Sequence, residues 1–346
     1  MSKWKGKRIS VEIFGTSHGE SIGVKTEGFP HFFWDENKLE KFMERRRGGQ
    51  GFGSTNRKEE DKPEFSFSDD GSFSAVIYNR NKKSGDYDEL YGKPRPSHAD
   101  YCSFVKDGTL DYRGGGRFSG RLTAPLCVAG GIAKQFLEQK NVRVYAYVAS
   151  VGKVRGKSYL DGVSEEEVAG ITGFPSIDKK EEMIAEIENA RSKEDSVGAV
   201  CECIVYGLPA GVGNDYFEGL EGTLSRLLFS IPAVKGVEFG SGFDLAKMNG
   251  SQANDAFYYD GEAVKTKTNH AGGINGGISN GMPVTMRIAF RPTPSIGKEQ
   301  QTVDLTNQEN TTIKIKGRHD ACVAIRALPA IESAVSIALL DEGEIL

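Results

Sequence analysis

The chain has 346 residues, of which 38% are hydrophobic and 27% charged, with a formal net charge of −4. This balance is typical of a globular protein with a sizeable core, and it gives no support for a nucleic-acid-binding or membrane-surface protein. Neither a signal-peptide pattern nor a run of about 18 apolar residues occurs, so we expect a cytoplasmic protein without membrane or nucleic-acid partners.

Two elements are predicted near the amino terminus. Residues 8–14 alternate isoleucine and valine with polar residues, which predicts a half-buried strand. In residues 35–46, Leu39 and Phe42 lie at helical spacing behind Asp35, a residue type that caps helix N-termini. We therefore expect a strand followed by an amphipathic helix.

The rest of the chain shows both periodicities. Period-2 alternation predicts strands at residues 142–152, 198–207 and 283–290. Apolar spacing predicts helices at residues 123–140, 181–193, 215–228 and 322–342. We expect Thr123 to cap the first of these helices and Pro329 to kink the last. The apolar composition of the last helix favours burial in a large core or in an oligomer interface.

Helices and strands follow one another without regular β-α-β alternation. This order predicts an α+β fold with antiparallel sheets rather than a doubly wound fold. The length alone is compatible with one large domain or two of ordinary size.

The five cysteines are interpreted as free thiols in a reducing compartment, because their number is odd and most lie in apolar segments. Cys201 and Cys203 alternate within a predicted strand, so both should point to one face and be buried. The ligand spacing of zinc sites is absent, and we expect no metal site.

Four of the five histidines lie in polar turns rich in small residues: His18, His98, His270 and His319. The fifth, His31, has aromatic neighbours and is interpreted as a packing or surface residue. Any one of the four could be structural, but four such loops in one chain favour proton transfer, since imidazole titrates near neutrality.

Several arginines accompany these loops: Arg45, Arg46, Arg47, Arg95, Arg113, Arg117, Arg121, Arg291 and Arg318. Guanidinium groups bind phosphates and carboxylates bidentately, so convergence on one ligand would hold a multiply charged anion. The alternative is that each lies on a solvated face. For Arg113 and Arg121 we favour that alternative or a structural ion pair.

Residues 112–120, "YRGGGRFSG", form a glycine-rich turn before the helix at 123–140. The segment fits neither the dinucleotide-binding fingerprint nor the Walker motif, because Ser119 replaces a glycine and the lysine is missing. Its backbone could still approach a phosphate, and the segment alone leaves this open.

Together these segments resemble the chorismate synthase family. The resemblance covers nearly the whole chain, in the family's order, through "FGTSHGESIG", "RPSHADY", "DYRGGGRFSGRLTA", "AVKGVEFGSGF", "GSQANDAF", "NHAGGINGGISNGMP" and "GRHDACVAIRALPAIESA". It implies one domain over residues 1–346, with core helices sandwiched between two antiparallel β-sheets. It also implies assembly as a homotetramer.

The activity implied by the resemblance is the 1,4-anti elimination of phosphate from 5-enolpyruvylshikimate 3-phosphate (EPSP), which gives chorismate with the help of reduced FMN. His18 would act as general acid toward the phosphate, and His98 would protonate or stabilise the reduced flavin. Asp320 would lie near the flavin and assist proton removal from the substrate ring. An external reductant is expected to supply the flavin's electrons, with NADPH as an indirect source.

The same resemblance assigns ligand contacts. The flavin site would comprise Arg117, Phe118, Ser119, Pro232, Ala233, Gly276, Arg291, Pro292, Thr293, Pro294, Ser295 and Arg318. The substrate would meet Arg45, Arg46, Arg47, Arg57 and Arg95, and also Arg117 and Arg318. Departures from the family pattern at Phe52, Phe118 and Pro232 put individual contacts in doubt.

Three other functions remain as alternatives. The chain could be a flavin oxidoreductase that uses NADPH on a substrate of its own, although no pyridine-nucleotide fingerprint is present. Residues 45–53, "RRRGGQGFG", could contact RNA, although the segment is short and acidic residues follow it. The apolar helix at residues 322–342 could serve an interaction protein.

Overall fold

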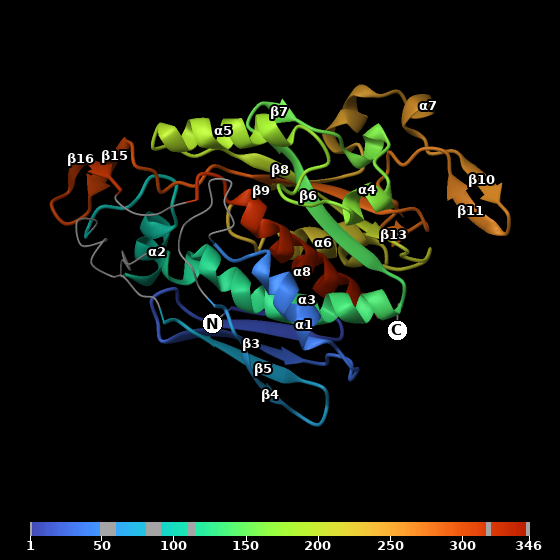
Figure 1. Ribbon diagram of the computed structural model, residues 1–346, viewed down its shortest axis with the longest axis horizontal. Helices are drawn as coiled ribbons and strands as arrows, with labels where there is room; N and C mark the ends of the chain where they lie inside the picture. The colour runs from blue at the N-terminus through green and yellow to red at the C-terminus, as the bar shows by residue number, and fades with distance from the viewer. Residues whose placement is uncertain (1, 49–59, 81–90, 109–114, 316–319, 344–346) are drawn as a thin grey trace.

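The computed structural model describes residues 2–48, 60–80, 91–108, 115–315 and 320–343. Two five-stranded antiparallel sheets enclose a layer of helices, with the first sheet at the bottom of Figure 1 and the second at the top. This arrangement confirms the predicted α+β class and the sandwich of helices between antiparallel sheets.

The amino-terminal part of the chain forms the first sheet, whose strand order is β1-β2-β3-β5-β4. Its strands are β1 (Ser2–Lys5), β2 (Ser10–Gly15), β3 (Ser21–Glu27), β4 (Glu64–Phe67) and β5 (Phe73–Tyr78). Apolar side chains such as Ile22 and Ile77 are buried against the helices. The strand predicted at residues 8–14 is confirmed as β2.

The second sheet has the order β7-β6-β8-β14-β9. Its strands are β6 (Arg143–Val151), β7 (Val154–Arg155), β8 (Ala199–Tyr206), β9 (Val234–Phe239) and β14 (Val284–Phe290). The three strands predicted in this region are confirmed as β6, β8 and β14. Cys201 and Cys203 are buried in β8 as free thiols, as predicted from their alternation.

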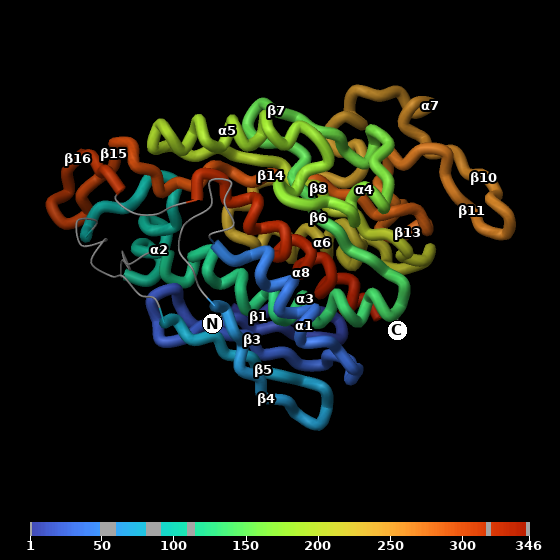
Figure 2. The backbone as a smooth tube through the Cα atoms, in the orientation of Figure 1, coloured from blue at the N-terminus to red at the C-terminus, as the bar shows by residue number. Residues whose placement is uncertain are grey.

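Four helices lie on the inner faces of the sheets: α1 (Glu36–Glu44), α3 (Thr123–Gln139), α6 (Leu220–Leu228) and α8 (Ala324–Glu342). Figure 2 shows α3 and α8 side by side through the middle of the molecule. A Cβ added at Gly130 of α3 would lie 2.0 Å from Cβ of Ser333, so the close helix contact requires glycine there.

Helix α8 is buried along almost its whole length and continues through Pro329. It packs on β6 and β8 on one side and on α3 and α6 on the other. Of the two locations predicted for this apolar helix, the structure shows the core of its own chain. A partner-binding role for the helix is therefore not supported.

Shorter elements cover the outer faces and edges. The helices are α2 (Asp100–Asp107), α4 (Glu165–Ala169), α5 (Lys180–Ser192) and α7 (Gly250–Ala253). The 3₁₀ turns are η2 (Gly116–Phe118), η3 (Gly120–Leu122), η4 (Tyr159–Asp161), η5 (Tyr216–Glu218) and η6 (Gly242–Lys247). The small hairpins are β10 (Phe257–Asp260) with β11 (Ala263–Thr266), β12 (Ile274–Asn275) with β13 (Ile278–Ser279), and β15 (Glu299–Asp304) with β16 (Glu309–Lys314).

Helix boundaries are right at Asp35 and wrong at two other places. The Asp35 side chain accepts hydrogen bonds from the amides of Asn37 and Lys38, so it caps α1 as predicted. Thr123 is not a cap: η3 leads directly into α3, and the Thr123 hydroxyl donates to the Gly120 carbonyl instead. The helix predicted from residue 215 begins only at Leu220, because Gly219 is extended.

None of the helices in the described part of the chain combines the length and the hydrophobicity that crossing a membrane requires.

Candidate active site

A cavity of about 260 Å³ lies where several loops meet the first turns of α3 and α8. Its lining residues fall within seven segments far apart in sequence, at positions 17–18, 46, 95–98, 115–123, 231–233, 291–295 and 320–327. Each segment contributes side chains that carry charge, a proton or a small apolar surface. The fold thus gathers most of the polar loops noted in the sequence at one place.

The beginnings of the two central helices face this cavity. Thr123, the first residue of α3, and Val323, which precedes α8, both line it. The helix dipole places partial positive charge at both helix starts, although the Thr123 amide of α3 already donates to carbonyls of η3. Both helix ends therefore favour an anionic ligand.

Guanidinium groups dominate the charge of the lining. Among the described residues it contains Arg46, Arg95, Arg121, Arg291 and Arg326 against the single carboxylate of Asp320. Two further carboxylates, Asp61 and Asp100, pair with arginines at its edge. The five arginines exceed these three carboxylates, so the cavity has an excess of positive charge.

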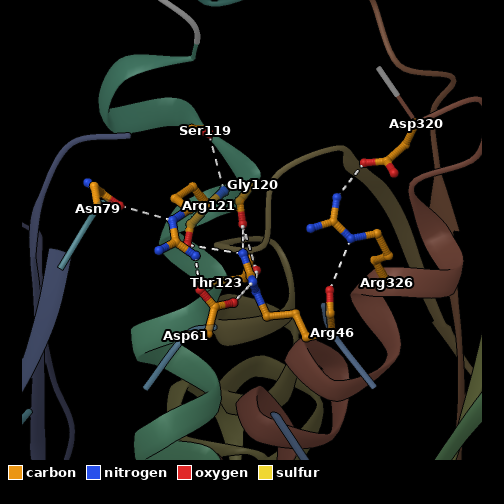
Figure 3. Close-up of polar contacts among 9 residues, drawn as sticks. All are labelled: Arg46, Asp61, Asn79, Ser119, Gly120, Arg121, Thr123, Asp320 and Arg326. Carbon is orange, nitrogen blue, oxygen red and sulfur yellow. Dashed lines mark hydrogen bonds and ion pairs between the residues drawn. The ribbon is translucent and has the colours of Figure 1, made fainter. Parts of the chain in front are cut away.

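One carboxylate pairs with two arginines beside the cavity, as Figure 3 shows. Arg46 donates to Oδ2 of Asp61 at 2.6 Å and to the Thr123 hydroxyl at 2.8 Å, and Arg121 pairs with Oδ1 of Asp61. Burial lowers the pKa of Arg46, and Asp61 opposes that effect. Because Arg46 is buried and held at several points, its position is set before a ligand arrives.

Asn79 connects this ion-pair cluster to the loop that carries His18. Its Oδ1 accepts from Arg121 Nε at 3.1 Å (Figure 3), and its Nδ2 donates to the carbonyls of Thr16 and Gly19. The Ser17 amide donates to the Gly116 carbonyl at 3.2 Å, which joins the same loop to the glycine-rich turn. His18 is therefore held at the cavity from two sides.

Asp320 and Arg326 form a second ion pair at the cavity. Arg326 Nη1 donates to Asp320 Oδ2 at 2.7 Å, and its Nε donates to the Arg46 carbonyl at 3.0 Å (Figure 3). Helix α8 supplies Arg326 from its first turns, so the rigid core positions the carboxylate of Asp320.

His98 and Arg95 both contact the carboxylate of Asp100. Nδ1 of His98 is 2.6 Å from Oδ1 of Asp100, while Arg95 contacts both oxygens of the same carboxylate at 2.7 and 2.8 Å. Burial alone would raise the pKa of Asp100, but hydrogen bonds from Arg95 and His98 outweigh it and hold the pKa well below its usual range. Asp100 is therefore ionised near neutral pH.

The structure brings most of the predicted site residues to this cavity. All three predicted catalytic residues line it, as do the predicted substrate residues Arg46 and Arg95. The predicted flavin residues in the lining are Phe118, Ser119, Pro232, Ala233, Arg291, Thr293, Pro294 and Ser295.

Other predicted substrate residues lie elsewhere. Arg45 pairs with Glu332 in the middle of α8, and Arg47 pairs with Glu44 on the surface of α1. The described start of the 45–53 segment thus has its arginines engaged with carboxylates of the chain, which does not favour the RNA-contacting alternative. Arg57 lies outside the described residues.

Three predicted flavin residues are also absent from the lining described. Arg117 pairs with Asp107 and stacks over Phe118, and Pro292 is exposed. Gly276 lines a separate, shallow cavity beside Gly219. Arg318 lies outside the described residues.

The remaining histidines are not in the described lining. His31 is exposed among aromatic residues, and Nδ1 of His270 is 2.8 Å from the Ser241 hydroxyl. His319 lies outside the described residues.

Sequence reasoning missed Arg326, Asp61, Asn79 and the role of Asp100. An arginine in the otherwise apolar helix at residues 322–342 was a usable signal for Arg326, since buried arginine is rare unless paired. The spacing of His98 and Asp100 could also have suggested contact. Nothing local in the sequence points to Asp61 or Asn79, whose partners are far away along the chain.

Known proteins resemble this chain along almost its whole length. A family model described as chorismate synthase matches residues 9–343. The chain is 43% identical to chorismate synthase of Thermococcus kodakarensis over 97% of this chain and 96% of that protein. It is 39% identical to the Dehalococcoides mccartyi enzyme of the same name over 99% and 96% of the two chains.

A solved structure titled "Crystal Structure of Chorismate Synthase" superposes with a TM-score of 0.73, covering 97% of this chain and 92% of that one. At 24% sequence identity this likeness shows the shared fold.

Proposed function

The chain belongs to the chorismate synthase family, which converts EPSP to chorismate, and we propose that the arginine-lined cavity is where it does so. The observation that carries this proposal is the meeting of His18, His98 and Asp320 in one cavity with an excess of guanidinium groups. The family uses reduced FMN, so the cavity region must serve two anionic molecules.

The charge of the cavity fits the substrate. EPSP carries a phosphate and two carboxylates, and a unit-charge pair at about 4 Å is worth about 4 kcal/mol at an effective dielectric of 20. Asp61 and Asp100 hold Arg46 and Arg95 in fixed positions, so these cations need little further ordering when a ligand binds. These arginines would bind the anionic groups and orient the ring.

The lining also fits a flavin. Phe118, Ile231, Pro232 and Pro294 supply apolar surface suited to a planar ring, and Arg291 adds a cation to the lining. Ala233 has a φ of 74°, a backbone strain that concentrates at ligand sites. The predicted contacts of Arg117, Pro292, Gly276 and Arg318 remain proposals that this lining does not support by itself.

The reaction breaks the ring carbon–oxygen bond to phosphate and one ring carbon–hydrogen bond, and it forms one double bond. Reduced FMN, when bound, supplies electron density transiently and recovers it, so no net redox change results.

His18 would give its proton to the departing phosphate, and neighbouring guanidinium groups would neutralise the charge that develops. Asp320 would assist removal of the ring proton, with Arg326 holding its carboxylate in place. His98 would take up a proton on its cavity-facing ring nitrogen and deliver it to the flavin ring. Loops and helix ends that enclose these groups would keep bulk water away from them.

A simple anaerobic experiment tests this function. Photoreduced FMN and EPSP are mixed with the chain, and both phosphate release and chorismate absorbance are followed. Equal amounts of the two products support the proposal, whereas no chorismate in the presence of bound reduced flavin would contradict it.

The source of electrons and the assembly are further parts of the proposal. We expect an external reductant, with NADPH only as an indirect source, because the chain has no pyridine-nucleotide fingerprint. Rapid reduction of bound FMN by NADPH alone, followed by stopped flow, would contradict that and revive the oxidoreductase alternative. A single domain over residues 1–346, assembled as a homotetramer, remains the proposed organisation.

A further inference from the structure

The contact between Asp100 and His98 leads to an inference about proton positions. We propose that Asp100 is a positioning residue that fixes His98 as the tautomer protonated on Nδ1 and so presents Nε2 to the cavity. This inference rests on the proposed function for its catalytic meaning, but the tautomer itself is a property of the chain alone.

Distance and chemistry together determine the tautomer. An ionised carboxylate can only accept hydrogen bonds, and Oδ1 of Asp100 lies 2.6 Å from Nδ1 of His98, so Nδ1 must carry the proton. Nη2 of Arg95 lies 3.2 Å from the same nitrogen and donates to Oδ1 of Asp100 at 2.8 Å. An Nδ1 without a proton would accept from Nη2 but would then face the carboxylate oxygen at 2.6 Å with no hydrogen between two acceptors. Nε2 is on the opposite edge of the ring, and His98 lines the cavity.

Asp100 is itself fixed more firmly than an ordinary surface aspartate. It is buried and accepts from the Arg95 side chain on both oxygens and from the Arg95 amide at 3.0 Å. Both oxygens of the Asp100 carboxylate therefore accept hydrogen bonds on the side that faces Arg95 and His98. The carboxylate has little freedom to turn away, which makes its control of the imidazole ring geometric as well as electrostatic.

The backbone of the loop supports the same arrangement. Ser97 has a φ of 58°, a left-handed conformation that costs about 1–2 kcal/mol in a residue with a side chain. This turn lets the His98 amide donate to the Arg95 carbonyl at 3.1 Å, which brings the two side chains to the same carboxylate. Thr302 donates to the Pro94 carbonyl at 2.5 Å and anchors the loop to β15.

Asparagine at position 100 would break this pattern with almost no change in shape. One of its two terminal atoms becomes an NH₂ donor, and both positions face donors of Arg95 or His98. The change that best relieves this conflict is transfer of the imidazole proton from Nδ1 to Nε2, since Nδ1 can then accept. The nitrogen at the cavity would change from proton acceptor to proton donor in the neutral ring.

The test uses ¹⁵N-histidine-labelled full-length chain without substrate or flavin, at a pH of about 9 where an ordinary imidazole is neutral. Ring ¹⁵N chemical shifts distinguish a protonated from a bare nitrogen, and the His98 signal is assigned by its loss in His98→Ala. We expect a protonated Nδ1 in the wild type and in Asp100→Glu, and a protonated Nε2 in Asp100→Asn. A protonated Nε2 of His98 in the wild type would by itself overturn the proposal, whatever the Asp100 variants show.

Turnover provides the second readout. Asp100→Asn should lose about 10²-fold or more in kcat, and Asp100→Glu should recover part of that loss because it keeps the carboxylate. Asp161→Asn, which changes a carboxylate of η4 outside the cavity lining, should match the wild type in both measurements. A switched tautomer with unchanged kcat would show that the nitrogen identity does not matter, and it would refute the positioning role.

The two readouts separate this inference from the proposed function. If the wild type makes no chorismate, the proposed function fails while the ¹⁵N shifts still report whether Asp100 fixes the tautomer. If chorismate forms but Asp100→Asn keeps its Nδ1 proton, the inference about Asp100 fails alone.

Discussion

Arg45 and Arg46 are adjacent in the sequence, yet they belong to two charged regions of different character. Arg45, whose side chain is exposed, donates to both oxygens of the buried Glu332 of α8 at 3.0 and 2.6 Å. Arg46 shares Asp61 with Arg121 at the wall of the cavity. Around Glu332, the cations of the chain are paired with a carboxylate of the same chain. Around the cavity, guanidinium groups outnumber the carboxylates.

The two regions differ in what remains for a ligand. Glu332 also accepts from the Ala146 amide at 3.1 Å and lies 3.5 Å from Lys134. Burial alone would raise its pKa, but Arg45 and Lys134 outweigh that effect and lower it. The contrast teaches that an arginine-rich segment is not a ligand site as a whole, and that only the side chains directed to the cavity are available for binding.

The largest effect should come from the proton carriers of the cavity. His18→Ala and His98→Ala should each lower turnover by about 10²–10⁴-fold, because each removes a general acid–base group or its support. Flavin affinity, measured by fluorescence titration, should stay within about twofold. His31→Ala, which changes a histidine outside the cavity lining, serves as control and should keep wild-type turnover. Wild-type rates in either cavity variant would remove that histidine from the mechanism.

The next effect should be on stability at the cavity. Asp61→Asn leaves Arg46 and Arg121 buried together without their shared counter-charge. Removing one partner of a buried ion pair costs about 3–5 kcal/mol, so the free energy of unfolding in urea should fall by that amount. A loss below about 1 kcal/mol would mean that the cluster relaxes or is solvated, and that Arg46 is not held in advance.

Arg45→Met should lower stability without changing substrate binding, and so distinguishes the Glu332 region from the cavity. Glu332 would lose one charged hydrogen-bond partner but keep Lys134 and the Ala146 amide, so unfolding should become easier by about 1.5–3 kcal/mol. The KM for EPSP should not change, because Arg45 is directed to α8. A tenfold increase in KM would restore the original prediction that Arg45 binds substrate and would contradict this comparison.

The smallest predicted effect concerns two buried glutamates, whose contributions to stability should change with pH in opposite directions. Burial raises the pKa of Glu202 on β8, which accepts from the Tyr147 hydroxyl and the Tyr159 amide, whereas the pKa of Glu332 is lowered. The Glu332 contribution is present above the unfolded-state pKa of about 4.3 and is lost as pH falls below it. For Glu202 the folded state holds its proton more tightly, so stability is lost as pH rises above about 4.3.

Urea unfolding of Glu202→Gln and Glu332→Gln between about pH 3 and pH 7 checks this sign. Relative to the wild type, the first variant should gain stability with rising pH and the second should lose it, as the directions of the two pKa shifts require. The same sign in both would show that their surroundings do not differ as described.

Local patterns predicted much of the fold. Alternation and helical spacing identified β2, β6, β8, β14 and the central helices, because residues close together in the sequence determine which face of each element is apolar. Thr123 was misassigned as a cap, since a 3₁₀ turn runs directly into α3. Arg46 donates to the carbonyls of Gly120 and Arg121 in that turn, a long-range contact that no local pattern contains.

The candidate site was predictable to a similar extent. The polar loops rich in small residues pointed to His18 and His98, and the family resemblance added Asp320 and most of the cavity lining. Directions of individual arginines were not predictable, because Arg45 and Arg46 diverge at the end of α1, where the helix geometry sends successive side chains to different neighbours. Asp61 and Asn79 act only through partners that the fold brings near.

The most direct test of the cavity as the reaction site is a crystal structure of the chain with FMN and EPSP bound together. We expect the phosphate and carboxylates of EPSP within hydrogen-bond distance of Arg46 or Arg95, with His18 next to the phosphate and His98 next to the flavin. EPSP bound outside this cavity, or with both histidines beyond reach of the two ligands, would contradict the account.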